Sequence, residues 1–101
     1  MKWLALPLVG VLAGLPVVTS AADIGRGGDF YGRYCSNCHG HDGRPVLPGA
    51  PDLSRPTALL KPDLELLMSI RSGRGAMPAY QGLMRDREIL DVVAYLRTLI
   101  R

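Results

Sequence analysis

The clearest hydrophobic pattern of the chain lies near its C-terminus. Between residues 86 and 100, apolar side chains recur every three or four positions, as they do on one face of an amphipathic helix. These residues are Ile89, Val92, Val93, Leu96 and Ile100. The spacing predicts a helix over residues 86–99.

A second helix is predicted over residues 62–72 from the signals at its two ends. Pro62 suits the first turn of a helix, and the acidic residues Asp63 and Glu65 favour the positive end of the helix dipole. Gly73 can close the helix at its other end. The start and stop signals therefore bracket one helical segment.

A third helical segment runs from about residue 24 to the two cysteines and is rich in glycine. It carries Phe30, Tyr31 and Tyr34 on one side, and four glycines, each of which costs a helix about 1 kcal/mol relative to alanine. Such a density of glycine indicates that another element packs closely against this backbone. Residues 43–56 hold four of the six prolines that follow residue 22 and are predicted to form a rigid irregular loop. No alternating strand pattern occurs, so the predicted fold class is all-α.

The first 22 residues have the pattern of a secretory signal peptide. One lysine precedes an almost unbroken apolar run over residues 4–18, and small residues follow up to Ala22. A bilayer span needs about 20 apolar residues, so this run is short for a retained anchor, which is the alternative. We expect cleavage after Ala22, export to the periplasm of a bacterium, no stable membrane insertion, and one folded domain over residues 23–101.

The composition of that domain limits the range of functions it can have. Among its 79 residues, 11 are basic and 9 are acidic, which makes nucleic acid an unexpected partner. A hydrophobic core of this size contributes only about 3–5 kcal/mol to the free energy of unfolding. Such small domains usually add a covalent cross-link or a prosthetic group. In an oxidising compartment, two cysteines form a disulfide unless something else occupies them.

Both cysteines and both histidines of the chain lie between residues 35 and 41. A redox-active disulfide between Cys35 and Cys38 is expected beside a βαβ pattern, which this chain lacks. A structural zinc site would need His39 and His41 as its second pair, but four ligands within seven residues cannot easily surround a tetrahedral ion. Neither reading accounts well for the cluster.

The third reading is haem. Cys-x-x-Cys-His is the attachment signature of c-type haem. On a helical turn, Cys35, Cys38 and His39 share a face, so two thioethers and an iron ligand can meet one porphyrin. His41 is too close to His39 in sequence to reach the opposite face of the ring and is interpreted as an exposed loop residue.

A second iron ligand must therefore come from a distant segment, and three methionines are candidates. Met68 lies mid-helix beside leucines and is assigned to the core, whereas Met84 precedes the last helix and is interpreted as an apolar plug. Met77 lies in an irregular loop after a helix, where glycines 73 and 75 allow the backbone to approach the ring. We therefore predict Met77 as the ligand.

Three motifs, "CSNCH", "GRGAMPAY" and "EILDVVAYLRTL", resemble those of the class I cytochromes c in the expected order. The resemblance implies three main helices packed around one covalently bound haem c. It also implies that the first helix crosses the last through Gly27 and Tyr31, facing Val92 and Tyr95.

The resemblance further implies that a proline carbonyl, that of Pro51 in preference to Pro48, accepts a hydrogen bond from His39, which would orient the ring. The family usually caps its last helix with Ser or Thr, and this chain has Arg85 at the matching position, so Asp86 is expected to take that role. Arg55 and Arg74 are the candidates to hold the haem propionates.

Ligation by His39 and Met77 would fill both axial positions, which suits a one-electron carrier and not an enzyme. The partners would be redox proteins that dock transiently, and the chain is expected to be a monomer. Residues 33–53 resemble the small c55X-type cytochromes associated with haem-d1-containing nitrite reductase in denitrifying bacteria. Two roles follow from that resemblance: electron donation to nitrite reductase, or an accessory redox function in haem d1 maturation. A ligand-sensing haem protein is a third reading, against which Met77 argues.

Overall fold

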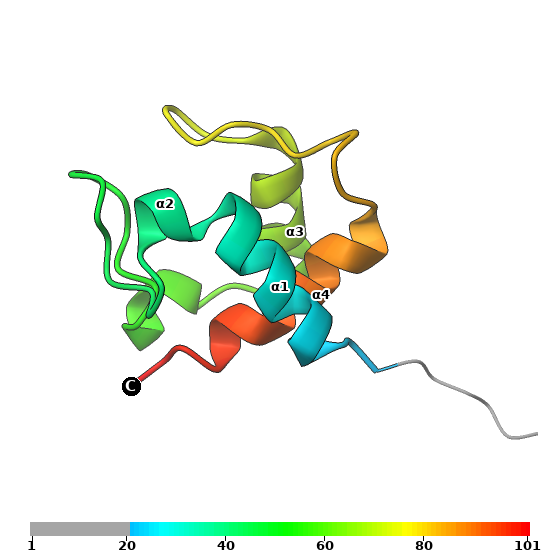
Figure 1. Ribbon diagram of the computed structural model, residues 1–101, viewed down its shortest axis with the longest axis horizontal. Helices are drawn as coiled ribbons and strands as arrows, with labels where there is room; N and C mark the ends of the chain where they lie inside the picture. Colours follow the sequence, from blue (N-terminus) through cyan, green and yellow to red (C-terminus); the bar gives the residue numbers. More distant parts are fainter. Residues whose placement is uncertain (1–20) are drawn as a thin grey trace, which may run out of the picture.

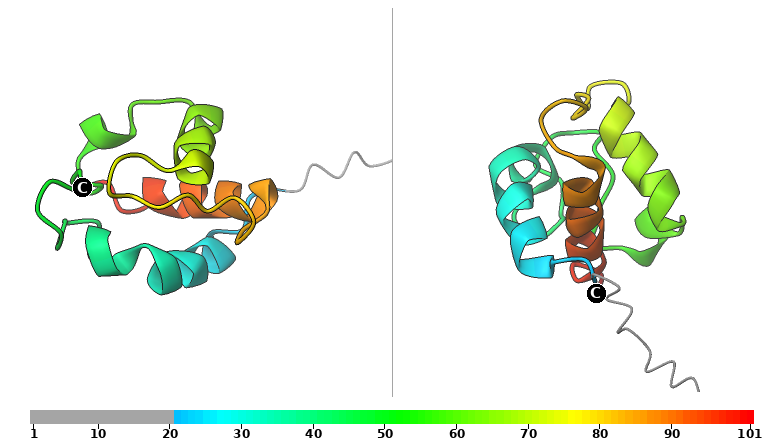
Figure 2. Two further views of the ribbon diagram at one scale, coloured as in Figure 1. Left: turned by 90° about the horizontal axis from the view of Figure 1, so that it is seen from above. Right: turned by 90° about the vertical axis from the view of Figure 1, so that its right-hand side faces the viewer.

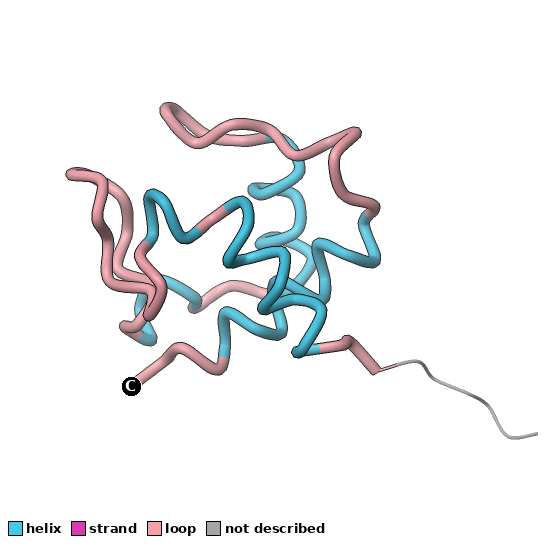
Figure 3. The backbone as a smooth tube through the Cα atoms, viewed as in Figure 1, coloured by secondary structure: helices cyan, strands magenta, loops and turns pink. Residues whose placement is uncertain are grey.

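The computed structural model describes residues 21–101, and in this part of the chain the regular elements are helices joined by loops (Figures 1 and 3). They are α1 (Ile24–Tyr34), α2 (Ser36–His39), the 3₁₀ helix η1 (Pro56–Leu59), α3 (Asp63–Ser72) and α4 (Asp86–Arg97). The three predicted helices and the all-α class are confirmed. The predicted signal peptide falls almost entirely on residues 1–20, outside the described residues, and stays a prediction.

Helix α4 is the centre of the fold, with α1 packed on one side and α3 on the other (Figure 2). The predicted hydrophobic face explains this position, because its residues Ile89, Val92 and Val93 are at most 1% exposed. No helix within residues 21–101 is long and apolar enough to cross a membrane.

The crossing of α1 and α4 requires a glycine. A Cβ on Gly27 would overlap the backbone carbonyl of Asp91, so the two helix backbones are in direct contact there. One turn later the ring of Tyr31 packs on the ring of Tyr95, with their centroids 5.3 Å apart. The predicted crossing is confirmed, and Gly28 adds to it because its Cα faces the Tyr95 ring.

The N-terminal end of α1 is fixed to α4 by a buried carboxylate. Asp91 is 2% exposed, and its Oδ2 accepts a hydrogen bond of 2.7 Å from Arg26 Nε. Its Oδ1 accepts a second hydrogen bond, of 2.8 Å, from the backbone N–H of Asp23. The Asp23 side chain in turn caps α1 by accepting from the Arg26 backbone N–H at 2.9 Å. Sequence patterning gave no sign of Asp91, because a carboxylate on the buried face breaks the apolar pattern.

One expectation about a side chain of α3 is wrong. Met68 is 53% exposed and Leu64 is 69% exposed, so Met68 is not a core residue. The buried face of α3 instead consists of Leu66, Leu67 and Ile70. The apolar residues of α3 surround the helix too widely for spacing alone to identify its inner face.

The cap of α4 also differs from the expectation. Arg85, not Asp86, is the N-cap residue, and its backbone N–H donates to the Glu88 side chain at 2.9 Å. Asp86 lies in the first turn and pairs with Arg71 of α3 at 3.3 Å. The Glu88 carboxylate, three residues into the helix, thus accepts from the N-cap backbone N–H, which is one of the two bonds of a capping box.

We expect Gly27→Ala to lower the free energy of unfolding by about 1–3 kcal/mol, the usual cost of inserting an atom into a packed contact. Denaturant unfolding measures this change. Gly32 lies in the same helix, and a Cβ added there would meet no other atom within 4 Å. Gly32→Ala should therefore raise stability by about 0.5–1 kcal/mol, because alanine is the better helix former. Equal effects at the two positions would contradict the close crossing.

Candidate functional site

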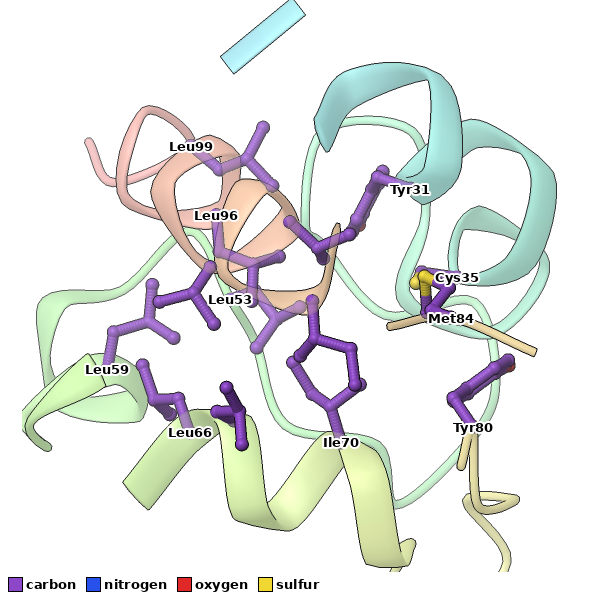
Figure 4. Close-up of a cluster of buried hydrophobic side chains, with 14 residues drawn as sticks. Tyr31, Cys35, Leu53, Leu59, Leu66, Ile70, Tyr80, Met84, Leu96 and Leu99 are labelled. Carbon is purple, nitrogen blue, oxygen red and sulfur yellow. The ribbon is translucent and has the colours of Figure 1, made fainter. Parts of the chain in front are cut away.

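A cavity of about 570 Å³ lies between the helices, within the range of roughly 300–1,000 Å³ that is typical of ligand pockets. Its walls are mainly apolar and come from Tyr31 of α1, Leu66 and Ile70 of α3, and Val92 and Leu96 of α4. Figure 4 shows side chains from all three helices pointing toward this shared interior. The cavity can hold a large flat apolar group.

The Cys-x-x-Cys-His residues lie along one side of this cavity. Helix α1 ends at Tyr34, and the carbonyl of Cys35 then accepts hydrogen bonds from the backbone N–H groups of Cys38 (3.2 Å) and His39 (2.9 Å). This helical turn puts all three side chains on the cavity, as their spacing predicted. The two thiols are not joined in a disulfide. Burial raises the pKa of the Cys35 thiol to about 11, while Cys38 is exposed.

His39 is half-buried, and its Nδ1 is a buried atom with no hydrogen-bond partner. The expected hydrogen bond to the Pro51 carbonyl is therefore not formed with normal geometry. Burial nevertheless lowers the pKa of His39 more than the nearby Pro51 carbonyl raises it. The neutral imidazole is thus favoured, and this is the form that binds a metal.

Met77 reaches the same cavity from the loop that follows α3. Gly73 ends α3 with a φ of +75°, and the backbones of Arg74 and Met77 then exchange two hydrogen bonds, of 3.0 and 2.8 Å. Gly75, with a φ of +55°, lies inside this tight turn, where a side chain would be strained. The glycines therefore shape the turn that carries the half-buried Met77 side chain.

Tyr80 fixes this methionine loop at both sides. Its backbone N–H donates to the Ile70 carbonyl of α3 at 3.2 Å, and its hydroxyl donates to the Tyr34 carbonyl of α1 at 2.8 Å. The loop is thereby tied to the helix that leads into Cys35. Its position relative to the cysteine turn is set by the protein itself.

The remaining candidates lie elsewhere. Met84 is buried in the core at 5% exposure and does not line the cavity, as expected for an apolar plug. Met68 faces solvent on α3. His41 is exposed in the loop after α2, which confirms its interpretation. Of these candidates, the structure brings together Cys35, Cys38, His39 and Met77.

Comparison with known proteins agrees with this geometry. Residues 22–96 match the family described as cytochrome c oxidase, cbb3-type, subunit III. Cytochrome c6 of Leptolyngbya boryana is 33% identical over 74% of this chain and 91% of its own length. Cytochrome c6 of Euglena viridis is 30% identical over 69% and 85%. The chain belongs to the class I c-type cytochromes.

Solved structures of such cytochromes have the same fold. Cytochrome c6 of the diatom Phaeodactylum tricornutum superimposes with a TM-score of 0.65 at 28% identity, over 75% of this chain and 92% of that one. The c-type cytochrome KustC0563 gives a TM-score of 0.70 at 22% identity, over 74% and 98%. This cytochrome is thus an electron carrier similar to cytochrome c6, and not an enzyme, with one covalently bound haem c as its cofactor.

The residues present fit that haem. The cavity offers apolar walls for the porphyrin, two free thiols at one side and a neutral imidazole beside them. Of the two arginines expected at the propionates, Arg74 lines the cavity. Arg55 does not, and it pairs instead with Asp52 at 3.5 Å. Lys61 also lines the cavity, a position that sequence reasoning missed.

Two further side chains position the walls through hydrogen bonds that the sequence did not indicate. The hydroxyl of Tyr31 donates to the Gly40 carbonyl at 2.5 Å, which holds the chain directly after His39. Arg97 at the end of α4 donates to the carbonyls of Leu59 and Lys61 at 3.0 and 2.7 Å. It also donates to the carboxylate of Asp63, the first residue of α3, at 2.8 and 3.0 Å. This planar fork fixes the segment that leads into α3.

Arg97→Lys should lower the free energy of unfolding by about 1–3 kcal/mol, because an ammonium keeps the charge but cannot reach both carbonyls and the carboxylate. The effect is read as a fall in Tm by circular dichroism. Arg85→Lys is the matched control, since Arg85 is exposed and caps α4 through its backbone. An unchanged Tm in Arg97→Lys would mean that α3 is positioned without the fork.

Proposed function

We propose that Cys35 and Cys38 attach the haem through thioethers and that His39 and Met77 are the two axial ligands of its iron. The observation that carries this proposal is that four residues from two distant segments line one apolar cavity. The cysteine turn approaches from α2 and the methionine from the loop after α3. A thioether ligand combined with an imidazole raises the reduction potential and leaves no open position for a substrate.

The bound haem supplies a one-electron couple, and the residues of the chain determine how easily it is used. Leu66, Ile70 and Val92 exclude water from the interior and keep the local dielectric low. The turn at Gly73 and the two hydrogen bonds of Tyr80 fix the loop that carries Met77. A fixed ligand set lets the electron move with little rearrangement, which is what a carrier requires.

We further propose that residues 1–22 are a cleaved signal peptide and that the protein works in the periplasm. The apolar run and its small-residue end support this, and so does the start of the folded part at residues 23–24. Covalent attachment of c-type haem outside the cytoplasm fits the same location. The folded domain would then be residues 23–101.

The proposed partner is a haem-d1-containing nitrite reductase, to which the reduced protein donates electrons. The support is the resemblance of residues 33–53 to the c55X-type cytochromes of denitrifying bacteria. The rim of the cavity combines exposed Leu47 and Pro48 with the cations Lys61 and Arg74. A mixture of apolar and cationic side chains suits a small, short-lived interface.

The ligand assignment is tested with Met77→Leu and, as matched control, Met84→Leu. Both changes keep volume and hydrophobicity, so the change in packing alone should cost less than about 1.5 kcal/mol in stability, and Met77→Leu additionally loses the bond to the iron. The oxidised protein should lose the weak far-red absorption band that reports a methionine–iron bond in Met77→Leu alone. Loss of that band in Met84→Leu with its retention in Met77→Leu would reverse the assignment.

Stopped-flow mixing of the reduced protein with oxidised nitrite reductase tests the partner. We expect rapid oxidation that slows several-fold as salt is raised, because charges at the rim steer the encounter. Lys61→Gln should slow the reaction and weaken its salt dependence, whereas Arg85→Gln, away from the cavity, should do neither. No electron transfer to the reductase would refute donation, and a defect in haem d1 insertion without this protein would then favour the maturation role.

A further inference from the structure

The buried carboxylate of Asp91 has two partners, and they come from residues next to the expected cleavage site. Arg26 Nε lies 2.7 Å from Oδ2, and the backbone nitrogen of Asp23 lies 2.8 Å from Oδ1. Asp91 is 2% exposed. A nearly buried charge on α4 is therefore held by the N-cap residue and the first turn of α1, which lie 68 and 65 positions away in sequence.

The peptide bond before Asp23 is accessible. Ala21 and Ala22 are exposed and irregular, and α1 begins only at Ile24, with Asp23 as its extended N-cap. A protease that needs an extended segment with small residues can reach this bond in the folded domain or before folding. The bond to be cut and the Asp91 contact thus share one atom, the nitrogen of Asp23.

We propose that cleavage between Ala22 and Asp23 turns this nitrogen into an ammonium that pairs with the Asp91 carboxylate, so that processing itself locks α1 onto α4. The protease adds one water across the bond, leaving a carboxylate on Ala22 and an ammonium on Asp23. This inference rests on the proposed signal cleavage and adds a structural role to the new N-terminus.

The charges around the site favour this pairing. Before cleavage, the buried carboxylate faces one cation, Arg26, and one neutral amide N–H. That amide hydrogen bond is already charge-assisted, because its acceptor is ionised. After cleavage the carboxylate faces two cations, so the attraction between two unit charges is added to the hydrogen bond. The positive end of α1 opposes an added cation, but the carboxylates of Asp23 and Glu88 lie near Arg26 and offset that repulsion.

The pairing makes stability depend on pH in a defined direction. An α-amino group has an ordinary pKa of about 7.7–8.0, and a carboxylate beside it raises the value in the folded state. Its contribution is therefore complete below the ordinary pKa and is lost as pH rises through the folded pKa. A rise of about one unit corresponds to a roughly tenfold change in the unfolding equilibrium constant.

The experiment uses the haem-loaded protein exported from a host that attaches c-type haem. Intact mass first identifies the N-terminus, which we expect at Asp23. A second form carries Gly-Ser between the cleavage site and Asp23, so the nitrogen of Asp23 stays an amide. Asp91→Asn is introduced into both forms, and the unfolding equilibrium is measured from pH 6 to about pH 10, across the range of the α-amino group.

We expect Asp91→Asn to raise the unfolding constant about tenfold more in the form that starts at Asp23 than in the Gly-Ser form. With Asp91 intact, only the form that starts at Asp23 should lose stability between pH 8 and 10, and Asp29→Asn on the exposed side of α1 should leave that loss unchanged. If Asp91→Asn does not fold, the inference is tested by comparing the pH dependence of stability in the two forms that keep Asp91, with and without Gly-Ser before Asp23.

Two results would overturn the inference. One is an N-terminus other than Asp23, and the other is equal stability and equal pH dependence in the two forms. Either result leaves the far-red band and its loss in Met77→Leu untouched. The inferred pairing and the proposed haem ligation can therefore be refuted independently of each other.

Discussion

The direct contact between the backbones of α1 and α4 is the constraint on which the other features depend. At Gly27 no side chain separates the two helices, and Tyr31 closes the crossing against Tyr95. Because α1 runs straight into the cysteine turn, the angle of this crossing also sets the direction in which Cys35 and His39 face. Packing between α1 and α4 therefore determines one half of the proposed haem site.

The other half is set by α3 and the loop that follows it. Arg97 ties the start of α3 to the end of α4, and Tyr80 ties the methionine loop to both α3 and α1. Both sides of the cavity, the one with the cysteines and the one with Met77, are thus positioned by helices that pack on α4. In a domain this small the haem is part of the interior, since the helix faces that would otherwise pack on one another line its cavity.

Sequence predicted the elements that have strong local signals. The apolar spacing of α4, the glycine after α3 and the spacing of Cys35, Cys38 and His39 all arise from the geometry of single helical turns. The sequence pattern did not predict the polar side chains whose role depends on a hydrogen-bond partner far away in the chain. The burial of Asp91 depends on Arg26 and Asp23, and the role of Arg97 depends on carbonyls that any residue could provide. Met68 was misplaced because apolar residues surround α3, and only the packed structure shows which side faces inward.

The central claim is that Met77 and His39 approach one haem from opposite sides. Proton NMR of the reduced, haem-loaded protein tests it most directly, because a methyl group held over the porphyrin face is strongly shielded by the ring current. The account predicts one methionine methyl resonance shifted far upfield, present in Met84→Leu and absent in Met77→Leu. A shifted methyl that belongs to Met84 or Met68, or none at all, would contradict it.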